Sequence, residues 1–179
     1  MVGCGKKEDG NTGVVNPNKP SPKAVPVNIA NPIVEKVIRA QLKKPTGELT
    51  QADLEKVPGL SLESHQLTDV KDLEKLPQLK ALDLSSNKLT SVNGLEKLTK
   101  LTMLNLNDNQ LTDVKGLENL TQVERLHLES NQLTSVKGLE NLKQLKKLNL
   151  KNNPDLTKAQ IDQLQKALPK CKIESNPTK

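Results

Sequence analysis

The stretch Leu101-Thr-Met-Leu-Asn-Leu-Asn-Asp-Asn109 has leucine at its first, fourth and sixth positions and ends in asparagine. A related pattern returns at a fixed interval along the middle of the chain, in units that begin at Val57, Leu79, Leu101, Val123 and Leu145. A fixed period of this length is typical of a solenoid, in which each unit forms one coil and packs against its neighbours. We therefore expect five stacked coils over residues 57–153.

The spacing of apolar residues inside a unit predicts the path of each coil. In the third unit they are Leu101, Leu104, Leu106, Leu111, Val114, Leu117 and Leu120. The fourth and sixth positions alternate with polar residues, which is the period of a strand with one buried face. The later spacing of three suits a short 3-10 return on the other side of the coil. Gly94, Gly116 and Gly138 precede that return, where the backbone must bend.

An asparagine occupies the ninth position of four units, at Asn87, Asn109, Asn131 and Asn153. A side-chain amide can both donate to and accept from backbone groups that a buried turn leaves without partners. We interpret this column as structural. His65 takes the same place in the first unit and is interpreted as a substitute that fills the turn.

Both ends of the repeat array carry helix signals. Asn31-Pro32 and the apolar residues that follow predict a capped helix within an N-terminal cap over residues 31–56. A second short turn is expected to begin at Thr50. Thr157-Lys-Ala-Gln160 is a capping box and predicts a helical C-terminal cap over residues 154–173, followed by a tail over residues 174–179.

These units resemble the leucine-rich-repeat motif Leu-x-x-Leu-x-Leu-x-x-Asn, and their length resembles the internalin-like bacterial subclass. The resemblance implies an α/β solenoid: a right-handed coil with a concave parallel sheet of about five strands, 3-10 returns on the convex side and helical caps. It also implies a non-catalytic module that binds a protein or peptide. One fold serves many partners, so the partner itself is left open.

The composition excludes several other functions. The chain has no Phe, Tyr or Trp, which argues against base stacking on single-stranded nucleic acid and against an aromatic cage for a cation. Its formal net charge of +6 lies in the two ends and not in a continuous basic stripe across the repeats. We expect no nucleic-acid partner, no cofactor and a monomeric protein.

Candidate binding residues are the polar positions of the strands, which should point out of the concave face. We expect Met103, Arg125 and His127 to anchor a partner, with Asn105, Glu129 and Lys147 beside them. Arg is common in binding hot spots, and Met adapts to varied surfaces. The alternative is a sheet face that contacts only water.

Catalytic and metal-binding alternatives are weaker. His127 and Glu129 lie close together along one strand and could share a metal ion, but a site needs three or four ligands and no others converge. Serines share the face with His127, yet the sequence supplies no orienting carboxylate or oxyanion donors for a nucleophile. We therefore expect neither a metal site nor an enzyme.

The segment over residues 1–30 suggests a membrane anchor. Val2-Gly3-Cys4 resembles the end of a bacterial lipobox, in which the cysteine becomes lipidated, and residues 5–30 form a polar segment that we expect to be a disordered tether. Gly5 after the cysteine resembles lipoproteins of the outer membrane. We expect a lipid-anchored protein of the bacterial cell envelope. Two alternatives stay open, a chance cysteine at Cys4 and an intracellular regulator that docks on an enzyme.

Overall fold

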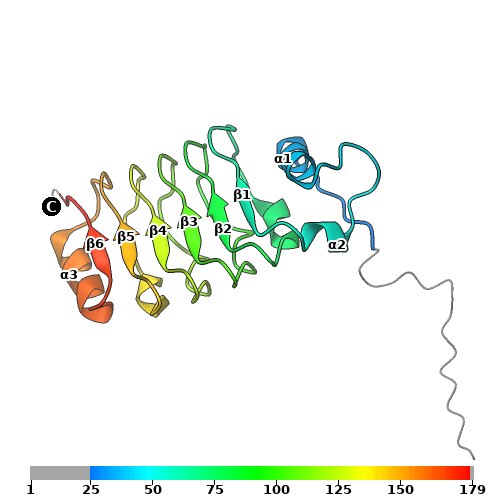
Figure 1. Ribbon diagram of the computed structural model, residues 1–179. Coiled ribbons are helices and arrows are strands. Elements are labelled where there is room, and N and C mark those ends of the chain that lie inside the picture. The colour runs from blue at the N-terminus through cyan, green and yellow to red at the C-terminus, as the bar shows by residue number, and fades with distance from the viewer. Residues whose placement is uncertain (1–24, 178–179) are drawn as a thin grey trace, which may run out of the picture.

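The computed structural model describes residues 25–177 of the chain, and Figure 1 shows the coils stacked in one row with a helix near each end. Two helices, α1 (Pro32–Leu42) and α2 (Gln51–Leu54), precede the sheet, and α3 (Lys158–Ala167) lies near its far end. The strands are β1 (Gly59–Ser61), β2 (Ala81–Asp83), β3 (Met103–Asn105), β4 (Arg125–His127), β5 (Lys147–Asn149) and β6 (Lys172–Glu174). The solenoid fold expected from the repeat is confirmed.

The six strands form one parallel sheet in chain order. Each strand pairs with the next at equivalent positions, so that Leu82, Leu104 and Leu126 lie side by side. Between β1 and β5 this register equals the period of the sequence repeat, which places the same column of the repeat at the same height in every coil. Columns of side chains therefore run across the sheet from one coil to the next.

The core consists of the aliphatic columns. All seven aliphatic positions of the third unit are buried, and the same columns are buried in the neighbouring coils. These leucines and valines form one continuous cluster that runs from the N-terminal cap to α3. Because every coil adds the same set of side chains, the domain obtains a closed core without aromatic residues.

The asparagine column lies inside the turn that follows each strand. The Oδ1 atom of Asn109 accepts from the backbone N–H of Leu89 at 3.0 Å in the preceding coil. Its Nδ2 atom donates to the carbonyls of Leu84, Leu106 and Asn107 at 3.0 to 3.2 Å. Asn87, Asn131 and Asn153 repeat this arrangement. One amide thus links two consecutive coils.

The bend before the return of the second, third and fourth coils depends on a glycine with positive φ. Gly94, Gly116 and Gly138 have φ of +103° to +107°, and each donates its N–H to the carboxylate of the glutamate that follows the next residue. Two returns are 3-10 helices, η2 (Lys71–Lys75) and η3 (Leu139–Asn141). The returns of the second and third coils contain turns instead.

The C-terminal end differs from the expectation of a helical cap over residues 154–173 and a tail from residue 174. Helix α3 begins after the Thr157 capping box as expected, but the chain then returns to the sheet and forms β6, which includes Glu174. This sixth strand pairs with β5 and covers backbone groups that an edge strand would otherwise leave open. The sheet is therefore one strand wider than the five repeats predict.

The N-terminal boundary also differs from the sequence interpretation, which ended the tether at residue 30. Ile29 is buried, and the Val27 N–H donates to the Leu49 carbonyl at 2.7 Å. The reason is the alternation Val27-Asn-Ile29, which supplies apolar side chains to the N-terminal cap. Helix α1 begins after the Asn31 cap, as the sequence predicts.

Candidate protein-binding face

The outward side chains of the six strands form one surface, called here the sheet face. In β3 and β4 the middle residue is buried and its neighbours are not. Met103, Arg125 and Lys147 therefore lie in one row across β3, β4 and β5, and Asn105, His127 and Asn149 lie in the next row. Glu129 lies just beyond the end of β4. The structure thus brings all six candidate binding residues onto one face.

Met103 and Arg125 are exposed on this face, where a partner could contact them. Met103 is 38% exposed, and within residues 25–177 Val25 is the only other large apolar side chain that is exposed. Arg125 is exposed, and within residues 25–177 its guanidinium makes neither an ion pair nor a hydrogen bond. An exposed thioether gains from burial against a partner, and an unpaired guanidinium beside it can bond to the partner's acceptors.

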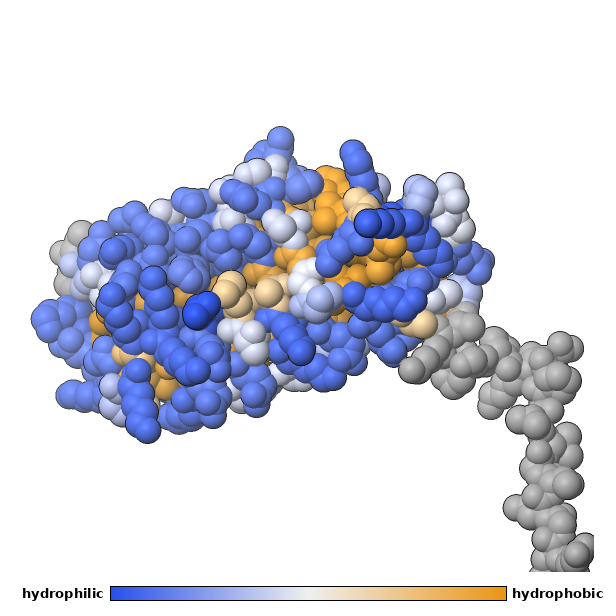
Figure 2. All heavy atoms as spheres, viewed as in Figure 1, coloured by the Kyte–Doolittle hydropathy of each residue, from blue (hydrophilic) through white to orange (hydrophobic). Residues whose placement is uncertain are grey.

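A shallow hollow of about 370 Å³ lies on the sheet face beside these residues. Its apolar wall includes Leu60, Ala81 and Met103, and its polar wall includes Asp83, Asn105 and His127. Figure 2 shows hydrophobic residues reaching the surface over the first strands and toward α1, whereas the later strands are mostly hydrophilic. The hollow therefore marks a border between apolar and polar parts of the face.

The surroundings of His127 favour the uncharged form of its imidazole. Burial lowers the pKa of its imidazole below the ordinary value of 6.5, and the nearby Lys147 lowers it further. Ser85, a serine on the same face, donates its hydroxyl to the Asp83 carboxylate at 2.6 Å. The Ser85 hydroxyl therefore donates to the Asp83 carboxylate and not to the His127 imidazole.

Several polar side chains of the face are already bonded to one another. Asn105 donates to Asp83 at 3.2 Å, and Asn107 accepts from the backbone N–H of Glu129 at 2.8 Å. The Glu129 carboxylate accepts from the side chain of Asn149 at 2.7 Å. Sequence reasoning treated these positions as facing water and missed this network. Its members hold the shape of the face and have less capacity left for a partner.

The last strand changes the charge of the basic end. Glu174 on β6 lies 2.9 Å from Lys172, 3.6 Å from Lys151 and 3.9 Å from Lys147, measured between carboxylate oxygen and ammonium nitrogen. Lys172 and Lys147 hold the pKa of the Glu174 carboxyl below its usual range. Glu174 lies in the segment that was expected to be a tail, so this partner of the candidate residue Lys147 was not predicted.

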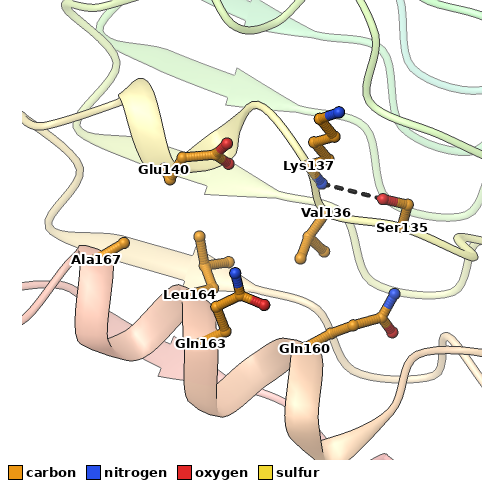
Figure 3. A pocket seen from close by; sticks show the side chains of 8 residues that line it. All are labelled: Ser135, Val136, Lys137, Glu140, Gln160, Gln163, Leu164 and Ala167. Atoms are coloured by element: carbon orange, nitrogen blue, oxygen red, sulfur yellow. Dashed lines mark hydrogen bonds between the residues drawn. The ribbon is translucent and has the colours of Figure 1, made fainter.

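A second hollow of about 370 Å³ lies between the return of the fourth coil and α3 (Figure 3). Val136 and Leu164 face it from opposite sides, and Gln160, Gln163 and Glu140 supply polar groups. None of the candidate binding residues lines it. The side chain of Gln160 donates to the Thr134 carbonyl at 3.0 Å, which ties α3 to the coil beside it.

The other reactive side chains of the described residues offer little chemistry. Within residues 25–177, no three His, Cys, Asp or Glu side chains are grouped so that they could hold a metal ion. None of the helices in this described range is both long and apolar enough to cross a membrane. Burial raises the pKa of the Cys171 thiol to about 11, which keeps it protonated. Cys4 lies outside the described residues.

The depressed pKa of His127 predicts a loss of stability in mild acid. As pH falls below 6.5, the unfolded chain takes up a proton on this side chain before the folded chain does, so the free energy of unfolding should decrease. His127→Gln should remove that part of the decrease as pH falls below 6.5. Urea unfolding followed by circular dichroism measures it. A His65→Gln control retains His127, and an equal effect of the two substitutions would contradict the assignment.

Comparison with known families and structures agrees with the repeat. The family model "Leucine Rich repeats (2 copies)" matches three overlapping segments, residues 77–119, 99–141 and 121–166. Together they run from residue 77 to residue 166, half of the 179-residue chain. A search of curated proteins found no match.

Solved structures with the same fold include two internalins of Listeria monocytogenes. The internalin inlF is 27% identical with a TM-score of 0.77, over 87% of this chain and 46% of its own. Internalin C2 is 26% identical with a TM-score of 0.77, over 88% of this chain and 71% of its own. A leucine-rich-repeat protein of Leptospira interrogans is 34% identical with a TM-score of 0.63, over 68% of this chain and 32% of its own. The chain thus spans about half the length of inlF.

Proposed function

This chain belongs to the leucine-rich-repeat family, and on that premise we propose that it binds a protein or peptide on its sheet face while a lipid on Cys4 holds it at a bacterial membrane. The binding role is non-catalytic. The observation that carries it is the pair Met103 and Arg125, an exposed apolar side chain and an unpaired cation on adjacent strands beside a hollow.

The size of the face limits the partner. Six strands at about 4.8 Å spacing make a sheet roughly 24 Å across, and short strands give it only a few hundred Å² of outward surface. A standard protein interface uses about 800 Å² from each partner. The sheet face therefore suits a short extended segment, or a larger partner that also contacts the turns after the asparagine column.

Binding can be tested with a peptide selected from a displayed library on residues 25–179. We expect Arg125→Ala and Met103→Ala each to reduce the free energy of binding by at least about 1 kcal/mol, roughly fivefold in affinity. Both side chains lie outside the core. Their melting temperatures should stay at the wild-type value. Lys115→Ala, an exposed change away from the strands, is the matched control. The sheet-face model would be refuted if Lys115→Ala weakened binding while Met103→Ala and Arg125→Ala left the affinity unchanged.

The anchor is proposed from the sequence Val2-Gly3-Cys4 ahead of a polar segment. In the native host, with the gene at its own locus, Cys4→Ser should move the protein from the membrane fraction to the soluble fraction. The wild-type protein should begin at Cys4 and carry the mass of acyl chains. Cys171→Ala changes the other cysteine and should leave the protein at the membrane. A soluble, unlipidated wild-type protein would instead favour an intracellular regulator.

A further inference from the structure

Three chemically different groups follow one another across the sheet face from β2 to β4. The Asp83 carboxylate accepts hydrogen bonds from the Ser85 backbone and hydroxyl and from Asn105, and within residues 25–177 it has no cation partner. Met103 on β3 is exposed beside the hollow. Arg125 on β4 has no acceptor in the same range of residues. An anion, an apolar hollow and a cation thus lie in sequence, and neither charge is neutralised by the other.

The neighbouring charges preserve this order. His127 lines the hollow, and burial and Lys147 favour its uncharged form by lowering the pKa of its imidazole. Lys147 lies beside Arg125 on the next strand but is paired with Glu174 at 3.9 Å, so within residues 25–177 it is Arg125 that offers an unpaired positive charge on this side. Glu129 is held by the amides of Asn149 and Asn152. Glu63 is exposed in the first coil and adds to the negative side.

The spacing of these groups matches an extended peptide. Asp83 is level with His127 across two strand spacings, and Arg125 lies two residues before His127 along β4. With strands about 4.8 Å apart and a rise of about 3.3 Å per residue, Asp83 and Arg125 are about 12 Å apart. In an extended chain, side chains at residues i, i+2 and i+4 point the same way, and the outer two are about 13 Å apart. The middle one then lies above the hollow next to Met103.

We propose that the sheet face recognises an extended segment with a basic, an apolar and an acidic side chain at every second residue. The basic side chain pairs with Asp83, the apolar one enters the hollow beside Met103, and the acidic one pairs with Arg125. This assignment rests on the proposed binding function and specifies its ligand. Opposite charges at both ends favour one register and reject uniformly charged segments.

Met103 supplies a direct reporter, because the chain contains only one other methionine, Met1. The probe is a synthetic capped peptide with the order Lys-Ala-Leu-Ala-Glu, titrated into protein labelled with carbon-13 at the methionine methyl groups. We expect the Met103 methyl signal to shift with saturation. Peptides with Leu changed to Ser, Lys changed to Glu, or Glu changed to Lys should each bind about fivefold or more weakly.

Protein variants then test the two charged contacts. Arg125→Glu should weaken binding of the parent peptide and should restore binding of the peptide in which Glu is changed to Lys. Asp83→Asn keeps an acceptor for Ser85 but removes the negative charge. It should therefore weaken binding of the parent peptide, whereas binding of a peptide with Ala in place of Lys should not change. Lys115→Ala should leave all of these titrations unchanged.

The results separate this proposal from the broader one. Equal binding of the parent and the uniformly charged peptides, or failure of the charge exchange at Arg125, would overturn the assignment. If no peptide of this series shifts the Met103 signal but a peptide selected from the displayed library does, the charge order is wrong and the binding function stands. If the selected peptide also binds without dependence on Met103 and Arg125, the sheet-face function itself is wrong.

Discussion

Gly94→Ala is expected to lower the free energy of unfolding by about 3 kcal/mol or more. Gly94 has φ of +107°, a backbone conformation that L side chains rarely adopt. A Cβ atom there would lie 2.8 Å from Lys71 Cα and 2.9 Å from the Val70 carbonyl oxygen. Both contacts are with backbone of the preceding coil, so relief would require the two coils to separate. Urea unfolding followed by circular dichroism measures the decrease in the free energy of unfolding.

Gly138→Ala is the matched control. Its φ of +103° imposes a similar conformational cost, but the added Cβ would lie 3.4 Å from Glu118 Cβ, near ordinary contact distance. The difference between the two variants should therefore measure the close approach of the first two coils. Equal losses of stability would mean that the backbone contact at Gly94 contributes nothing.

Asn109→Ala is expected to lower the free energy of unfolding by about 3 kcal/mol. The substitution removes the acceptor of the buried Leu89 N–H and the donor to three carbonyls, and leaving buried backbone groups without partners is costly. Because Asn109 bonds to two coils, its loss should loosen the stack as well as one turn. The midpoint of denaturant unfolding measures the effect.

Asn119→Ala provides the comparison, because Asn119 is exposed and its change should stay within about 0.5 kcal/mol. Asn107 is a poor control despite its position on the sheet face, since its side chain accepts from the Glu129 N–H. Equal midpoints for Asn109→Ala and Asn119→Ala would show that the asparagine column does not stabilise the coils.

Much of the fold could be predicted from the sequence because the same requirement is repeated in every coil. Leu104 and Leu106 must face inward in any coil with this period, so the strand and its neighbours follow together. The sixth strand breaks the period, since Ile173 pairs with Leu148, which lies further back in the chain than one repeat length. Only the alternation Lys172-Ile173-Glu174 indicated it, and such a short apolar pattern is ambiguous alone.

The candidate site was predictable in position and not in detail. The alternation of polar and apolar residues places Met103 and Arg125 on one face, but it does not reveal that Glu129 is held by Asn149. That contact depends on distances between side chains of different coils. The glutamates that accept from Gly94, Gly116 and Gly138 had a signal, a glutamate at the second position after each glycine, that the sequence analysis did not use.

The register of the sheet has an evolutionary consequence. Because β1 to β5 pair at intervals of one whole repeat, duplication or loss of a coil preserves the leucine columns and the asparagine column at the new junction. When the coil concerned is the third, which carries β3, the same event moves Asp83 and Arg125 one strand further apart or closer together. Ligand length can therefore change in steps of one strand while the core needs no compensating substitution, so recognition and stability can evolve separately.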